Sequence, residues 1–122
     1  MEVAKLVPSG FKLRRIHRLT SGEDYSRVFN APRRLQDKLI TILYRPNDYG
    51  RPRIGFAIAK KKVPKSFFRN RIRRICKETF RYRRQHFPAL DIIILARQAA
   101  ARASKEDLFI SFMAHWKKIE EK

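Results

Sequence analysis

The chain has 122 residues, of which 30 are Lys or Arg and 11 are Asp or Glu, so its formal net charge is +19 at pH 7. Hydrophobic residues make up 43% of the sequence, enough for the core of one domain, which excludes wholesale disorder. Four Gly and six Pro exclude a collagen-like chain, and a single Cys, Cys76, excludes an internal disulfide framework.

The large positive charge favours a polyanionic partner, because like charges repel one another in a compact fold. Arg is abundant, and its planar guanidinium matches phosphate and stacks on bases. Nucleic acid is therefore favoured over an anionic membrane surface, which typically meets Lys beside an exposed apolar helix face. No apolar run approaches the roughly 20 residues of a membrane span, and the lone Cys fits a reducing cytoplasm, where we expect the protein.

Residues 1–19 are predicted to form a basic, extended arm, and a short helix follows it. Thr20 or Ser21 can cap this helix, and acidic residues occupy its first turn, where the helix dipole favours negative charge. Pro32 ends it. Its apolar face, at helical spacing, consists of Tyr25, Val28 and Phe29.

Residues 38–44 are apolar and β-branched, which predicts a strand covered on both sides, and residues 33–36 are expected to pair beside it. Residues 53–59 predict a second strand whose two faces differ. One face carries Ile54, Phe56 and Ile58, and the other carries Gly55, Ala57 and Ala59. The small face leaves a flat surface that a helix or a ligand can approach closely.

Residues 65–85 predict the longest helix, and residues 91–96 predict a buried strand after it. Strand, helix and strand in this order indicate a crossover that makes the two strands parallel. Ser104 and Asp107 resemble a capping box that opens a last helix. The apolar positions of that helix are expected in the core and comprise Leu108, Phe109, Phe112, Met113, Trp116 and Ile119.

The long helix has two contrasting faces. At 100° per residue, a narrow apolar stripe contains Phe68, Ile72, Ile75, Thr79 and Tyr82. The opposite side is a cationic ridge made of Arg69, Asn70, Arg73, Arg74, Lys77, Arg81 and Arg84, with Arg71 near its edge. Like charges three or four residues apart on a helix repel one another and destabilise it. Binding to the phosphate backbone of a nucleic acid compensates for this repulsion, because it releases condensed counterions. Lys60, Lys61 and Lys62 precede this helix and predict an anion-binding corner.

Catalytic patterns are poor by comparison. The three histidines, His17, His86 and His115, are scattered, and the single Cys provides no zinc-ligand spacing. The sequence contains no Gly-x-Ser-x-Gly segment and no Gly-rich phosphate loop. These observations favour a binding module over an enzyme with its own catalytic residues.

The segment Arg69-Asn70-Arg71-Ile72-Arg73-Arg74, preceded by the strand that ends in Lys60-Lys61, resembles the protein subunit of bacterial ribonuclease P. The Arg-Asn-Arg helix is characteristic of that family. Further similarities run in the family's order over about residues 16–118 and include Glu23 to Phe29, Phe80-Arg81 and Asp91 to Arg97. Two departures are Tyr25, where Phe is more usual, and one extra residue between Lys61 and Arg69.

The resemblance implies a single α+β domain over residues 1–122, an α/β sandwich with about four strands, three helices and a left-handed βαβ crossover. It implies the RNA-binding protein subunit of an endonuclease that removes the 5′ leader of precursor tRNA. In that family a large RNA is the catalyst and holds the Mg²⁺. No catalytic residue and no metal site are therefore expected in the protein, which we expect to be a monomer in a 1:1 complex with the RNA subunit.

Carried over by position, the resemblance assigns RNA contacts to Arg69, Asn70, Arg71, Arg73, Arg74, Lys77 and Arg81, and basic positions near the leader path to Lys60 and Lys61. It places three aromatic residues at the leader cleft: Tyr25, Phe29 and Phe56. For Tyr25 and Phe29 an ordinary helix-to-sheet core pair is an equal alternative.

An alternative function is that of a structural RNA-binding protein, such as a ribosomal one. A self-sufficient nuclease is disfavoured, because no carboxylate cluster able to hold metal is visible.

Overall fold

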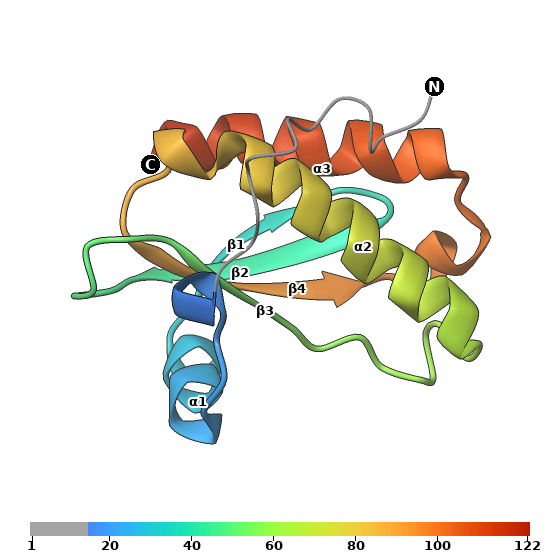
Figure 1. The fold of residues 1–122 in the computed structure, drawn as a ribbon. Coiled ribbons are helices and arrows are strands. Elements are labelled where there is room, and N and C mark those ends of the chain that lie inside the picture. Colours follow the sequence, from blue (N-terminus) through green and yellow to red (C-terminus); the bar gives the residue numbers. More distant parts are fainter. Residues whose placement is uncertain (1–14) are drawn as a thin grey trace.

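A computed structural model describes residues 15–122 of the chain. Within this range the chain forms three α-helices and a four-stranded sheet, and Figure 1 shows how they are arranged. The helices are α1 (Gly22–Asn30), α2 (Ser66–Arg83) and α3 (Lys105–Glu120). The strands are β1 (Arg33–Gln36), β2 (Ile40–Pro46), β3 (Arg53–Phe56) and β4 (Leu90–Ala96). Short 3₁₀ turns are η2 (Arg15–His17), η3 (Arg84–His86) and η4 (Gln98–Arg102).

The strand order in the sheet is β1-β2-β4-β3. β1 pairs antiparallel with β2, β2 pairs antiparallel with β4, and β3 pairs parallel with β4, with Ile54 opposite Ile92. The predicted α+β fold and the parallel crossover through α2 are therefore confirmed, and the left-handed sense of the crossover stays a prediction. β3 ends earlier than residue 59, because the Ala59 carbonyl accepts hydrogen bonds from the Lys62 and Val63 amides and the chain turns away.

The sheet separates two apolar layers. α2 and α3 cover one face and α1 lies against the other (Figure 1). The larger layer is fully buried at Trp116, Phe80 and Phe112, and the Trp116 indole Nε1 donates to Thr79 Oγ1 at 2.8 Å. This bond satisfies the polar atom of a buried Trp and joins α2 to α3.

The buried face of α2 differs from the predicted stripe. Ile72, Ile75 and Thr79 are buried as expected, whereas Tyr82 is 41% exposed. Cys76 and Phe80 occupy the core in its place. α2 packs on α3 as well as on the sheet, so its apolar surface is wider than a stripe that serves one layer.

α1 and α3 begin where their sequences predict. Ser21 accepts a hydrogen bond from the Asp24 amide, and Ser104 accepts one from the Asp107 amide, both at 3.1 Å. Such caps satisfy amides that the helix itself leaves unpaired. Both predicted helix starts are confirmed, with Ser21 as the cap of the first helix.

Most of the predicted N-terminal arm, residues 1–14, lies outside the described residues. The described part is attached to the sheet, because Arg18 forms a β-bridge with Ile54 and the Leu19 amide donates to the Ile54 carbonyl at 2.8 Å. Within residues 15–122 the structure has no helix with the length and hydropathy needed to cross a membrane.

Candidate nucleic-acid interface

A cationic groove runs along the outer side of α2. We call it the α2 groove; it has a volume of about 640 Å³ and is lined by Arg18, Asn70, Arg73, Arg74, Lys77, Glu78 and Arg81. Five of these residues are predicted RNA contacts: Asn70, Arg73, Arg74, Lys77 and Arg81. Residues spaced three and four apart on a helix share one face, which is why the sequence pattern brings them together. The guanidinium of Arg73 donates to Asn70 Oδ1 at 2.9 Å, which fixes two of these side chains relative to one another.

Arg18 also lines the α2 groove, although the sequence predicts that it belongs to a separate N-terminal arm. It reaches α2 because η2 and the bridge to Ile54 carry the N-terminal segment across the sheet edge. In the sequence, Arg18 is only a basic residue that precedes an apolar one, and nothing there indicates contact with α2. The structure shows that this apolar residue, Leu19, is buried. Contact with a helix more than fifty residues away depends on the tertiary fold.

Fewer residues of the predicted cationic ridge line the groove than the sequence predicts. Arg69 Nη1 donates to the carbonyls of Val63 and Pro64 at 2.9 and 2.7 Å, and Arg71 Nη2 donates to the Ala103 carbonyl at 3.1 Å. Neither arginine lines the α2 groove. Arg84, which the helix projection placed on the ridge, lies in η3 with Nη1 3.1 Å from His17 Nε2.

The three aromatic residues assigned to one leader cleft do not share a face. Tyr25 packs with the α1 layer, and its hydroxyl accepts a hydrogen bond from the Phe56 amide at 3.1 Å. Phe29 is 45% exposed at the end of α1. The Phe56 side chain packs instead against the core on the α2 side, with Lys77 Nζ 5.8 Å from its ring centroid. Phe56 thus lies on the opposite face of the sheet from Tyr25, because successive residues of a strand point to opposite faces and the preceding Gly55 faces Tyr25.

Tyr25 also explains the small face of β3. A Cβ atom on Gly55 would overlap the Tyr25 hydroxyl, so the flat surface predicted at Gly55 accommodates a helix side chain. Ala57 and Leu95 are only partly buried beside this contact. The α1 face of the sheet thus has partly buried apolar side chains beside Tyr25, and α1 also carries the exposed Phe29.

An ion cluster around Asp91 fixes α1 on the sheet. The fully buried carboxylate accepts hydrogen bonds from Arg53 Nε and Nη2 and from Asn47 Nδ2, each at 2.8 Å. Arg27 of α1 pairs with the same carboxylate, and Arg53 also contacts Asp24 of α1 at 3.2 Å. Burial alone would raise the pKa of Asp91, but the hydrogen bonds from Arg53, Asn47 and Arg27 outweigh it and lower the pKa.

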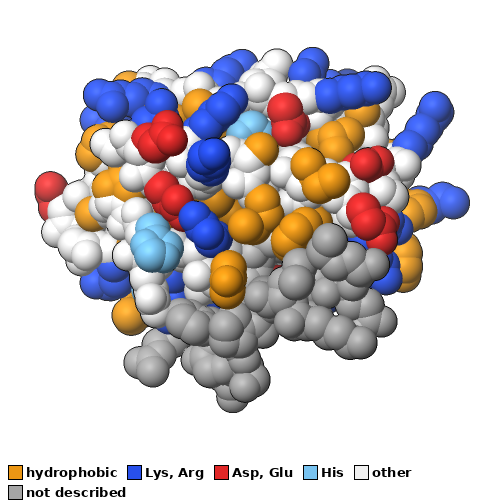
Figure 2. All heavy atoms as spheres, turned by 90° about the horizontal axis from the view of Figure 1, so that it is seen from above, with side chains coloured by type: hydrophobic (Ala, Val, Ile, Leu, Met, Phe, Trp, Pro, Cys, Tyr) orange, Lys and Arg blue, Asp and Glu red, His pale blue; other side chains and the backbone are white. Residues whose placement is uncertain are grey.

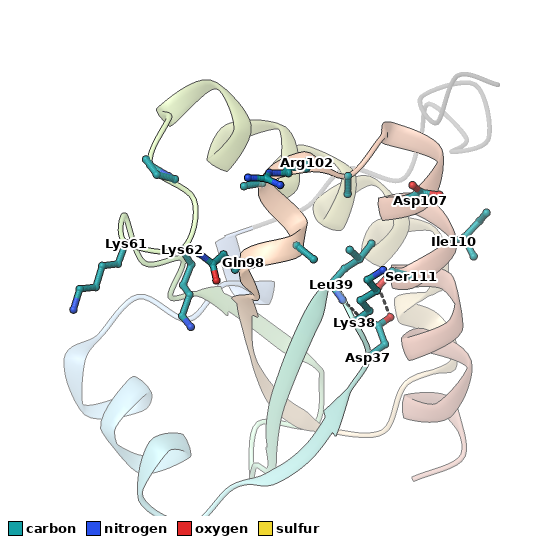
Figure 3. Close-up of a pocket in the computed structure, with 14 residues that line it drawn as sticks. Asp37, Lys38, Leu39, Lys61, Lys62, Gln98, Arg102, Asp107, Ile110 and Ser111 are labelled. Carbon is teal, nitrogen blue, oxygen red and sulfur yellow. Dashed lines mark hydrogen bonds between the residues drawn. The ribbon is translucent and has the colours of Figure 1, made fainter.

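Lys60 and Lys61 are exposed in the segment between β3 and α2. Lys61 lines a hollow different from the α2 groove, formed with residues of η4 and α3 (Figure 3). The face over α2 and α3 that Figure 2 shows is mixed, with acidic side chains interspersed among Lys, Arg and hydrophobic residues. One ion pair joins the two helices: the Arg83 guanidinium of α2 pairs with Glu120 of α3 at 2.6 Å.

Metal ligation does not fit these residues. Within residues 15–122, no three His, Cys, Asp or Glu side chains are grouped to hold an ion. Asp91 already accepts from Arg53 and Arg27, and the α2 groove has cationic residues around its one carboxylate, Glu78. Mg²⁺ prefers several oxygen ligands, which this surface does not provide.

Comparison with known proteins identifies the same family over nearly the whole chain. The sequence model described as Ribonuclease P matches residues 13–120. The ribonuclease P protein component of Pseudoalteromonas translucida is 37% identical over 112 residues, which are 92% of this chain and 80% of the relative. That of Photorhabdus laumondii is 38% identical over 101 residues, which are 83% of this chain and 85% of the relative.

A solved structure shares the fold. The ribonuclease P protein of Staphylococcus aureus superposes with a TM-score of 0.76 at 25% identity, covering 84% of this chain and 94% of that one. The helix and strand arrangement described above is thus that of a protein with the same family name.

Proposed function

Because this chain belongs to the ribonuclease P protein family, we propose that its α2 groove binds the phosphate backbone of RNA. The family acts in removal of the 5′ leader from precursor tRNA together with an RNA subunit, and this chain is its protein component. One observation carries the residue assignment: Arg18, Asn70, Arg73, Arg74, Lys77 and Arg81 converge on one groove from two segments of the chain.

The proposed mechanism is electrostatic. Each Lys or Arg that neutralises a phosphate releases condensed counterions, which favours binding and makes it depend on salt. Arg73 and Arg74 supply planar guanidinium groups suited to phosphate, and Asn70 holds Arg73 in place. Bringing these charges to the region where RNA subunit and leader meet raises substrate affinity and reduces the Mg²⁺ that the reaction needs.

For the leader, we propose the α1 face of the sheet. Tyr25 and Phe29 of α1 are the aromatic residues that we propose for this site, and stacking of a base on an aromatic ring contributes about 1–3 kcal/mol. Lys60, exposed after β3, is the basic residue that we propose for the leader backbone. Phe56 has no part in this surface, since its ring lies on the other side of the sheet.

We expect Mg²⁺ to be held by the RNA subunit and the substrate, which supply phosphate oxygens that this surface lacks. The protein's own residues then bind and orient RNA and carry out no proton transfer. We further propose that the protein acts as a monomer in a 1:1 complex with the RNA subunit in the cytoplasm. Light scattering of the assembled complex measures that stoichiometry.

The direct test is reconstitution of precursor-tRNA cleavage at limiting Mg²⁺. The RNA subunit is assayed alone, with this protein, and with a variant in which Arg73, Arg74 and Lys77 are replaced by Ala. We expect cleavage to increase with the protein and to increase much less with the triple variant. Equal stimulation by both proteins would contradict the assignment to the α2 groove.

A structural RNA-binding protein, for example a ribosomal one, shares the charge and the size of this chain. Competition between precursor tRNA and ribosomal RNA separates the two functions. Preference for precursor tRNA in the presence of the RNA subunit supports the proposal, whereas unchanged cleavage together with tight ribosomal RNA binding supports the rival.

A further inference from the structure

A second hollow, which we call the η4 hollow, lies where the segment between β3 and α2 meets η4 and the start of α3 (Figure 3). Its volume is about 1110 Å³. The apolar part of its lining consists of Leu39, Pro64, Ala99, Ala101, Ala103 and Ile110. Its cationic side chains are Lys38, Lys62 and Arg102, and Lys61 extends away from the other labelled side chains. The lining thus combines an apolar surface with positive charge.

The three cations are available to a ligand. Lys38, Lys62 and Arg102 are exposed, and none forms an ion pair or a side-chain hydrogen bond with another residue of the described range 15–122. Three unpaired cations around a concave surface repel one another and attract an anion. Their positive charge is therefore free to meet phosphate.

Two carboxylates in the lining, Asp37 and Asp107, offset part of this positive charge. Asp37 keeps its negative charge and offsets part of the charge of the neighbouring Lys38, while both of its oxygens are engaged within the protein. Oδ1 accepts from the Leu39 and Ile40 amides at 2.8 Å, and Oδ2 accepts from Ser111 Oγ at 2.5 Å and lies 3.2 Å from His115 Nε2. Asp107 is exposed at the start of α3. It disfavours phosphate on the α3 side, so an anion is favoured beside Lys62 and Arg102.

Arg69 and Arg71, which do not line the α2 groove, form hydrogen bonds to the backbone of the η4 hollow. Arg69 donates to the Pro64 carbonyl at 2.7 Å, and Pro64 lines the hollow on one side. Arg71 donates to the carbonyl of Ala103, which lines it on another side, at 3.1 Å. The Arg-Asn-Arg triplet is therefore divided: Asn70 faces the α2 groove, and its two neighbours fix the shape of the η4 hollow.

We propose that the η4 hollow binds one unpaired nucleotide of RNA, an inference that rests on the proposed function. Lys62 and Arg102, which lie on either side of Gln98 (Figure 3), contact the two phosphates that flank this nucleotide, the apolar lining contacts the base, and the Gln98 amide, which can donate and accept, faces the base edge. An unpaired nucleotide fits better than a duplex, because a concave apolar surface reaches a base only when that base is turned out of a helix. Arg69 and Arg71 are positioning residues for this site.

The test compares Lys62→Ala/Arg102→Ala with a control double variant of equal charge loss, Lys117→Ala/Lys118→Ala, whose side chains are exposed on α3. Binding of the full-length proteins to a short single-stranded oligoribonucleotide and to a duplex of the same sequence is measured over a range of salt concentrations. Loss of two phosphate contacts to a single strand should lower the salt slope by about 1.4. We expect that loss for the single strand and none for the duplex or the control.

Two further arms identify the source of the nucleotide. A loss of affinity for the isolated RNA subunit assigns it to that subunit, and a loss confined to precursor tRNA assigns it to the substrate. If the hollow variant binds every RNA as the control does while Arg73→Ala weakens binding, the η4 site is overturned and the proposed function stands. Equal losses for single strand and duplex overturn the assignment of an unpaired nucleotide.

Arg71→Ala tests the positioning role. It should lower affinity for the single-stranded oligoribonucleotide with an unchanged salt slope, because the hollow changes shape and no phosphate contact is removed. Arg71→Lys, which can still donate to the Ala103 carbonyl, should restore part of the affinity. A slope reduced by about 0.7 would show that Arg71 contacts phosphate directly and would overturn its positioning role. Thermal unfolding of each variant confirms that it is folded.

Discussion

Arg73 lies within the α2 groove and is held by Asn70. We predict that Arg73→Ala weakens association with the RNA subunit and lowers the salt slope by about one, as expected for one lost phosphate contact. Lys117→Ala, the matched control, removes the same charge from the exposed side of α3 and should leave the slope unchanged. Filter binding over a salt series measures both, and equal slopes for the two variants would place Arg73 outside the interface.

Asp91 is the side chain whose removal should cost most stability. It is fully buried between Arg53, Arg27 and Asn47, so Asp91→Ala removes a partner of the buried Arg53 guanidinium and of the partly exposed Arg27 guanidinium. We predict a loss of about 3–5 kcal/mol in the free energy of unfolding, measured by urea denaturation at pH 7. Asp48→Ala, which removes an exposed carboxylate between β2 and β3, should change this free energy little.

The contribution of Asp91 to the free energy of unfolding depends on pH, because the pKa of Asp91 is lowered in the folded protein. A carboxyl group whose pKa is lower in the folded protein contributes its full stabilisation above the unfolded value, near 3.9, and loses it as pH falls through the folded value. The difference in unfolding free energy between the wild type and Asp91→Asn should therefore be constant from pH 7 to about 5 and shrink below about 4. A difference that grows on acidification would contradict this.

At the level of elements, the approach of α1 to β3 depends on one glycine. A Cβ on Gly55 would overlap the Tyr25 ring, whose hydroxyl accepts from the Phe56 amide. We predict that Gly55→Ala destabilises the fold by about 1–3 kcal/mol, as is typical of overpacking, and that the loss shrinks in a Tyr25→Ala background. Gly22→Ala is the control, because a Cβ there meets no atom within 4 Å. Denaturation of the four proteins of the cycle gives the coupling, and additive losses would exclude the contact.

α2 combines two roles that its sequence separates only in part. Its buried residues Ile75 and Phe80 join the sheet to α3, and its outer residues Lys77 and Arg81 line the groove. Because the helix is held on two sides, its cationic side is kept in a fixed position relative to Arg18. An interface built on a packed helix loses less conformational entropy on binding than one built on a loop.

At the scale of the whole molecule, the net charge of +19 opposes folding and favours RNA. We predict that raising the NaCl concentration from low to moderate ionic strength increases the Tm of the free protein, because screening relieves self-repulsion. The increase should be roughly 4 °C for each kcal/mol of repulsion removed. The same salt should weaken RNA binding. A Tm that falls with salt would show that attractive ion pairs, such as those of Asp91, outweigh the repulsion.

Local features of this protein followed from the sequence alone. Ser21 and Ser104 cap helices through hydrogen bonds that span three residues, so neighbouring residues suffice to predict them. The strand at residues 91–96 and the crossover before it follow from short apolar patterns and their order. The cationic side of α2, from Asn70 to Arg81, follows from helical periodicity, and the Arg-Asn-Arg triplet indicated the family.

Only the tertiary structure decided which long-range contacts these elements make. It brought Arg18 to the α2 groove, placed Phe56 on the other side of the sheet from Tyr25, and exposed Tyr82 while burying Phe80. It also directed Arg69 and Arg71 to the carbonyls of Pro64 and Ala103. Periodicity determines which side of an element a residue occupies, whereas its partners depend on how separate elements pack, and packing joins residues that are distant in the chain.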